Sequence, residues 1–130
     1  MGPPGIIQHH ARARQLIEFK GMVFERGISP TDIDAFLDFG GKLFFFFEVK
    51  SGETPVPYGQ KLAMERICDA MALAGECIYI IARHDTPAAE AIVLSTCRVS
   101  EYRWKNKWHR QETEKTVMQF LTSARERLNL

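Results

Sequence analysis

The sequence has 130 residues, of which 45% are hydrophobic, and its formal net charge at pH 7 is +1. This length suits one hydrophobic core, so we expect a single domain over residues 1–130. No apolar run approaches the length of about 18 residues that a membrane-spanning helix needs, and the chain start has no secretory-signal pattern. We therefore expect a cytoplasmic protein with no membrane partner.

The first half of the chain contains one expected helix and three expected strands. Apolar residues at helical spacing predict a helix over residues 8–19, and the stretch 22–27 predicts a short strand. Two longer strands, 32–39 and 43–50, flank the pair Gly40-Gly41, which is typical of a hairpin. The second of them contains four consecutive phenylalanines and is apolar on both faces, so we expect it inside the sheet.

The second half of the chain is expected to alternate between helices and strands. The stripe of apolar residues between 58 and 74 predicts a helix, and the apolar run 77–83 predicts a strand after it. A further strand is expected over 91–99, and a closing helix over 112–128. Together these elements predict an α/β domain with a mixed sheet flanked by helices.

The register of the first hairpin decides whether two of its carboxylates share one face. A two-residue turn at Gly40-Gly41 would put Phe47 opposite Asp34 and turn Glu48 away. A three-residue loop that also includes Lys42 would put Glu48 opposite Asp34. The sequence allows both arrangements.

In the second register, the hairpin carries a pattern that suits metal-dependent chemistry on phosphates. Asp34 and Glu48 would repel each other unless a cation neutralised them, and an all-oxygen site suits Mg²⁺ or Mn²⁺. Lys50 points to the same face and could stabilise charge on a phosphate oxygen or orient the attacking water. Gln60 lies on the sheet-facing stripe of the following helix, in its first turn, and is expected to reach toward the same place.

Asp34, the run Glu48-Val49-Lys50 and a helix carrying Gln60 resemble the PD-(D/E)XK nuclease superfamily. Its members include restriction endonucleases, Holliday-junction resolvases and virus-type replication-repair nuclease modules. The resemblance covers residues 8–85 and implies a restriction-endonuclease-like fold with an αβββαβ core. It also implies a metal held by Asp34, Glu48 and the backbone carbonyl of Val49, with Lys50 as the catalytic lysine and Gln60 beside it.

Two other acidic residues stay open as additional ligands of this site. Glu18 resembles the acidic residue that some family members contribute from the first helix. The Pro-Asp dipeptide of the family is absent here, because Thr31 separates Pro30 from Asp32. The spacing to the E-x-K run favours Asp34 as the ligand, although Asp32 could also serve.

A basic and aromatic segment near the C-terminus is a candidate nucleic-acid contact. Its cations could bind phosphates and its indoles could stack on bases or sugars. If the segment forms a hairpin, the aromatic rings could instead cover the edge of the core. The candidate residues are Arg103, Trp104, Lys105, Lys107, Trp108 and Arg110.

The sequence therefore predicts an endonuclease that hydrolyses DNA phosphodiester bonds with Mg²⁺ or Mn²⁺. One alternative is a Holliday-junction resolvase acting as a homodimer, because cutting two strands needs two active sites. Another is a catalytically silent nucleic-acid-binding or assembly module on the same fold. In a further alternative, Glu48 and Lys50 form only a structural ion pair at the end of a strand.

Overall fold

A computed structural model describes residues 17–130 of the chain. The contacts within the chain group residues 1–31 and 32–130 into two compact units. No helix among the described residues is long and apolar enough to cross a membrane.

Residues 17–31 of the first unit contain the 3-10 helix η1 (Glu25–Gly27) and no strand. The strand predicted over 22–27 is therefore wrong. Arg26 and Gly27 have φ angles of 62° and 74°, a left-handed turn that extended backbone excludes. Most of the helix predicted over 8–19 lies outside the described residues, and its last three positions are not helical.

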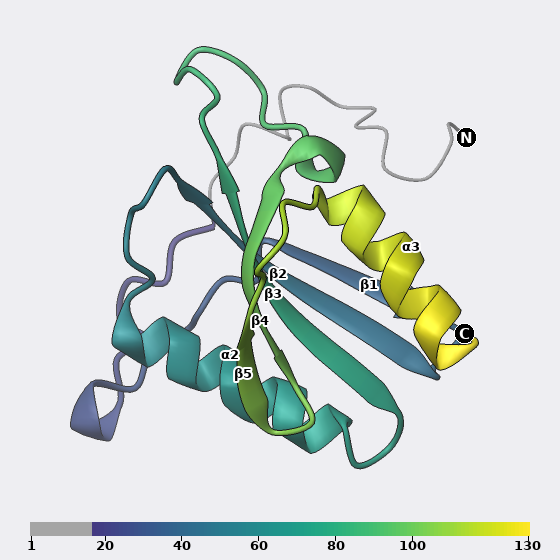
Figure 1. Cartoon of the computed structure of the whole chain (residues 1–130). Coiled ribbons are helices and arrows are strands. Elements are labelled where there is room, and N and C mark those ends of the chain that lie inside the picture. The colour runs from purple at the N-terminus through teal and green to yellow at the C-terminus, as the bar shows by residue number, and fades with distance from the viewer. Residues whose placement is uncertain (1–16) are drawn as a thin grey trace, which may run out of the picture. The chain divides into compact units, whose positions relative to one another are not determined.

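The second unit is a mixed α/β structure built on a five-stranded sheet in the order β1-β2-β3-β4-β5 (Figure 1). Strands β2 and β3 are parallel, and every other neighbouring pair is antiparallel. The strands are β1 (Ala35–Phe39), β2 (Leu43–Ser51), β3 (Glu76–His84), β4 (Arg98–Trp104) and β5 (Lys107–Arg110). The helices are α2 (Tyr58–Met71), the 3-10 helix η2 (Leu94–Thr96) and α3 (Val117–Leu128).

The two α-helices cover opposite faces of this sheet, which explains the run of phenylalanines in β2 (Figure 1). Side chains alternate between faces along a strand, so Phe45 and Phe47 join the core under α3, whereas Phe46 joins the core under α2. Strand β2 has neighbours on both sides, as expected of a strand that is apolar on both faces.

The first hairpin has a three-residue loop, with Phe39 paired to Leu43. Gly40 and Gly41 have φ angles of 65° and 75°, a backbone conformation that residues with a Cβ rarely adopt. The carboxylate of Asp38 accepts a 2.6 Å hydrogen bond from the backbone N–H of Gly41, which fastens the loop. Of the two registers that the sequence allows, this is the one that directs Asp34 and Glu48 to the same face.

Strand β1 is shorter than predicted, because it begins at Ala35 and not at Asp32. For β1 to extend further, the backbone of residues 32–34 would have to pair with residues 48–50 of β2. The backbone N–H of Val49 instead donates to the side chain of Asp34, which replaces the ladder and ends the strand.

Two predictions for the second half of the chain also need correction. Residues 91–99 do not form one strand, because η2 lies inside this range and β4 starts only at Arg98. The last helix begins at Val117 and not at 112. Thr116 and Gln119 form a capping box that satisfies backbone N–H groups at that point, which fixes the helix start.

Candidate active site

Asp34 connects the end of β1 to the backbone of β2. Its Oδ2 accepts a 2.7 Å hydrogen bond from the backbone N–H of Val49. The N–H and C=O of a strand residue lie on the same side of the strand, so the carbonyl of Val49 also lies on the side of Asp34. The side chain of Asp34 and the backbone of Val49 thus meet at the C-terminal end of β2.

Glu48 is buried beside them, with only 2% of the residue exposed. Its Oε1 lies 3.2 Å from the ammonium nitrogen of Lys50. Its Oε2 accepts a 2.9 Å hydrogen bond from the side-chain amide of Gln60, which comes from the first turn of α2. Four of the predicted site residues, Asp34, Glu48, Lys50 and Gln60, therefore lie together at one end of the sheet.

The surroundings of Glu48 raise the pKa of its carboxyl above the ordinary value of 4.5. Burial is the largest cause, because it penalises the charged form, and the negative charge of Asp34 acts in the same direction. The hydrogen bond and charge of Lys50, and the amide of Gln60, oppose the shift without cancelling it. Even with Lys50 beside it, ionised Glu48 is therefore less favourable here than an ionised glutamate in solvent.

Tyr79 is a neighbour of the site that sequence reasoning missed. It is fully buried on the α2 side of β3, and Glu48, Asp34 and Glu101 all contribute to a raised pKa of its phenol, after burial as the main cause. Within residues 17–130 its hydroxyl has no hydrogen-bond partner. The apolar run around Tyr79 does not indicate a place near the site, because a tyrosine ring in such a run is an ordinary core group.

A second missed feature is the ion pair between Lys61 and Glu101, whose charged atoms lie 2.8 Å apart. Glu101 is aligned across the sheet with Ile81, which is aligned with Glu48, so all three share the face under α2. Lys61 also lies 4.3 Å from the ring centre of Trp108. The charged site thus continues from β2 across the sheet to β5.

The donor set fits a hard divalent cation that keeps several of its waters. The carboxylates of Asp34 and Glu48 and the carbonyl of Val49 are oxygen ligands, which Mg²⁺ and Mn²⁺ prefer. No group of three or more His, Cys, Asp or Glu side chains suited to a metal occurs among the described residues. This number of side chains is compatible with Mg²⁺, which is usually bound by one or two carboxylates, with water and substrate phosphates completing the shell.

Asp32 and Glu18 are the other two acidic candidates for metal ligands. Asp32 is exposed and precedes β1, and the hydrogen bonds described for the site do not include it. Glu18 belongs to the first unit, and its role as a ligand stays a prediction.

The basic and aromatic segment forms the β4–β5 hairpin, whose turn residues Lys105 and Asn106 have φ angles of 52° and 61°. Arg103 is committed to the protein interior: it forms ion pairs with Glu65 and Asp69 of α2, at 2.8 and 2.7 Å. The Asp69 hydrogen bond is the main cause of its raised pKa.

The two indoles of this hairpin pack on opposite faces of the sheet. Trp108 contacts Tyr79 under α2, and Trp104 packs against the core under α3 while its N–H donates to Glu76. Both aromatic rings therefore cover core edges. Three of the candidates for nucleic-acid contact are exposed cations: Lys105, Lys107 and Arg110.

Comparisons of the chain with protein-family models, with curated proteins and with solved structures found no match in any of the three. The resemblance to PD-(D/E)XK nucleases consequently depends on the residues and the geometry described above, and it stays a prediction.

Proposed function

We propose that the chain is an endonuclease that hydrolyses DNA phosphodiester bonds with Mg²⁺ or Mn²⁺, on a restriction-endonuclease-like fold. The observation that carries the proposal is the buried carboxylate of Glu48, bonded to both Lys50 and Gln60 and placed beside Asp34. A second carboxylate next to a buried one lowers stability, and such a cost is common at functional sites.

Asp34, Glu48 and the carbonyl of Val49 would hold the metal. When bound, the metal supplies Lewis-acid polarisation of the phosphate and makes a water a better nucleophile. Its positive charge also removes the repulsion between the two carboxylates, which favours ionised Glu48.

Lys50 and Gln60 have separate parts in the proposed reaction. In the structure, Lys50 is held by Glu48 at 3.2 Å, and sharing the charge of Glu48 with a metal would leave its ammonium available to a phosphate oxygen. There it would stabilise the negative charge that develops as water attacks phosphorus and the bond to the leaving oxygen breaks. Gln60 is a positioning residue, because its amide fixes the second oxygen of Glu48.

The test is a cleavage panel with defined DNA forms and metals. Plasmid, single-stranded, flapped and four-way-junction DNA are incubated with the purified protein and Mg²⁺, Mn²⁺ or EDTA. We expect cleavage with either metal and none with EDTA. Inactivity on every substrate with both metals would contradict the proposal and favour the catalytically silent module.

The same panel tests the resolvase alternative. Symmetric cleavage of the four-way junction, together with a dimer mass in solution, would identify a homodimer with one site for each strand. Equal cleavage of all DNA forms by a monomer would exclude this alternative.

A further inference from the structure

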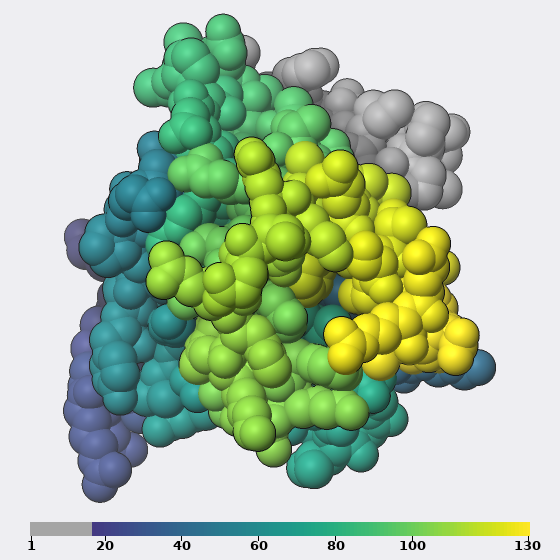
Figure 2. Space-filling view, in the orientation of Figure 1, coloured from purple at the N-terminus to yellow at the C-terminus, as the bar shows by residue number. Residues whose placement is uncertain are grey.

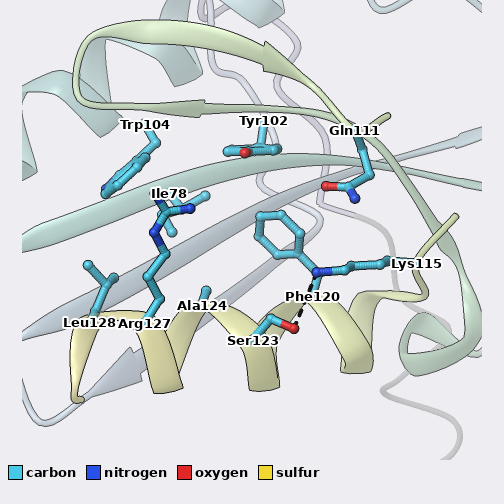
Figure 3. A pocket seen from close by; sticks show the side chains of 10 residues that line it. All are labelled: Ile78, Tyr102, Trp104, Gln111, Lys115, Phe120, Ser123, Ala124, Arg127 and Leu128. Carbon is cyan, nitrogen blue, oxygen red and sulfur yellow. Dashed lines mark hydrogen bonds between the residues drawn. The ribbon is translucent and has the colours of Figure 1, made fainter. Parts of the chain in front are cut away.

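A small pocket lies on the other face of the sheet, between α3 and strands β3 and β4. Figure 2 shows the molecule hollowed between the yellow helix α3 and the green β4–β5 hairpin. The pocket has a volume of 110 Å³. Its walls, which define what we term the aromatic pocket, are formed mainly by Ile78, Tyr102, Trp104, Phe120, Ala124 and Leu128 (Figure 3).

The walls of the aromatic pocket have the shape and chemistry to hold one flat ring. Tyr102 and Phe120 are in contact edge to face with their ring centres 4.8 Å apart, and Tyr102 also stacks on His109 at 5.0 Å, so a ligand ring would lie beside these rings and against Trp104, not between them (Figure 3). A volume of this size is comparable to cavities of about 150 Å³ that accept benzene. A single six-membered ring fits these dimensions better than a fused ring system.

The polar groups of the pocket are two cations with no carboxylate between them. Lys115 and Arg127 line it together with Gln111 and Ser123, and the lining includes no Asp or Glu. In the part of the chain that the structure describes, neither cation takes part in an ion pair, whereas Arg98 and Arg103 do. The pocket therefore combines aromatic walls with uncompensated positive charge.

The two cations approach from different sides of the Phe120 ring (Figure 3). The guanidinium of Arg127 lies 5.7 Å from the ring centre of Trp104, and the ammonium of Lys115 lies 3.3 Å from the hydroxyl of Ser123. A ligand with a ring in the pocket and an anionic group at its mouth can reach either cation. Gln111 and Ser123 add hydrogen-bonding groups for a polar ring edge.

We propose that the aromatic pocket binds a pyrimidine nucleotide, with the base against the aromatic walls and the phosphate on Arg127 or Lys115. Stacking on aromatic side chains is a common way to hold a base, and arginine and lysine are the usual partners of phosphate. The required chemistry is the same for a free mononucleotide and for one nucleotide of a single strand. The pocket is on the α3 face, so this proposal does not depend on the proposed cleavage at the α2 face.

The test measures binding with EDTA present, so that neither a metal nor cleavage contributes. Cytidine 5′-monophosphate, cytidine and a short oligodeoxycytidine are titrated into the whole chain by calorimetry, with tryptophan fluorescence as a second readout because Trp104 is in the wall. We expect the monophosphate to bind at least about tenfold more tightly than the nucleoside, because a charge-assisted hydrogen bond is lost without phosphate. Tighter binding of the oligonucleotide would identify a strand as the source, and tighter binding of the mononucleotide would identify the free nucleotide.

Variants locate the binding. Arg127→Gln and Lys115→Gln are expected to weaken binding of the monophosphate, by about tenfold in the more strongly affected variant. Binding of cytidine should change little in either variant. Ala124→Leu fills the pocket and is expected to weaken binding of both the monophosphate and cytidine. Arg66→Gln removes an exposed cation from α2 on the other face and is the matched control, with unchanged affinity.

Three results would overturn the proposal. They are the absence of binding by every ligand, equal affinity for monophosphate and nucleoside, and losses in both Arg127→Gln and Lys115→Gln that are no larger than the loss in the Arg66→Gln control. Thermal melts of each variant establish that the folded protein is being compared. Because metal and cleavage are absent, none of these results bears on whether the α2 face cuts DNA.

Discussion

The side-chain amide of Gln60 donates a 2.9 Å hydrogen bond to Oε2 of Glu48, so the first turn of α2 is connected to the buried end of β2. This contact brings a helix residue to the same carboxylate that Lys50 approaches from the strand. Glu48 is therefore held from two elements, which leaves its carboxylate little freedom to turn.

Gln60→Ala is expected to destabilise the protein at neutral pH by about 1–2 kcal/mol, because a hydrogen bond to a charged group is lost. The loss is expected to be smaller in acid, since the amide of Gln60 favours the ionised form of Glu48. Urea unfolding at neutral and at acid pH measures the loss of stability under each condition. Gln111→Ala, which removes an exposed side-chain bond to Thr113, is the control with a change below about 0.5 kcal/mol. An equal loss at both pH values would mean that Gln60 acts only by packing.

The contribution of Glu48 to the stability of the metal-free protein is expected to fall as pH rises. Burial and Asp34 raise the pKa of Glu48 above 4.5, so the protonated form is favoured by folding. The associated stability is fully present below the ordinary value of 4.5 and is lost as pH rises through the higher folded-state pKa. This direction is opposite to that of a carboxylate stabilised by an ion pair.

Glu48→Gln isolates this effect, because the variant cannot titrate at this position. Its charged Lys50 loses a partner at every pH in the range, which shifts the stability curve without changing its slope. The free energy of unfolding in EDTA, measured from acid to neutral pH, should therefore fall more steeply in the unmodified chain than in the variant. Parallel curves would contradict the raised pKa.

Tyr79→Phe is expected to raise the free energy of unfolding by about 1 kcal/mol, because it removes a buried hydroxyl that has no partner within residues 17–130. The ring and its edge-to-face contact with Trp108 are kept. Tyr58→Phe, at a residue that is 79% exposed, is the control and should have no measurable effect. A destabilised Tyr79→Phe variant would mean that the hydroxyl has a useful partner in solution.

The general architecture of the second unit could be predicted because its signals are local. The paired glycines predicted a hairpin, and the apolar stripe after Tyr58 predicted α2. The register of the hairpin could not be decided, because both loop lengths are compatible with the two glycines. The structure selects the longer loop, in which Asp38 accepts from the backbone of Gly41.

Other features depended on distant partners and could not be read from local patterns. The apolar run before Leu94 resembles a strand, yet the pairing with β3 begins only at Arg98. Arg103 suggested a phosphate contact, but Glu65 and Asp69, from a helix more than 30 positions earlier, hold it inside the protein. Its environment is set by tertiary structure, so composition alone could not identify its role.

Different residues of the β4–β5 hairpin are expected to affect DNA affinity and folding stability. Replacing Lys105 and Lys107 with Ala should weaken DNA binding and flatten its dependence on salt by about 0.9 logarithmic units per lost phosphate contact. Arg103→Ala should instead lower stability by about 2 kcal/mol, since two acidic partners lose their cation, a value reduced by their partial exposure. Binding titrations at several salt concentrations and urea unfolding distinguish these effects.

Lys42→Ala, in the loop of the first hairpin, is the matched control for the loss of an exposed cation. An unchanged salt slope in the Lys105 and Lys107 variant would mean that these two lysines make no phosphate contacts.

Lys50→Met gives the sharpest separation of catalysis from folding, because methionine keeps most of the length of the side chain and removes its charge. If Lys50 stabilises charge on the phosphate, cleavage at saturating DNA should fall by at least about a hundredfold, whereas DNA binding in EDTA should be almost unchanged. If Lys50 and Glu48 form only a structural pair, the variant leaves a buried carboxylate without its cation and should lose about 3–5 kcal/mol of stability. Cleavage, binding and thermal melts are measured together, with Lys42→Met as the control at an exposed cation. A strongly destabilised variant whose folded fraction still cuts DNA at the normal rate would contradict the catalytic role of Lys50.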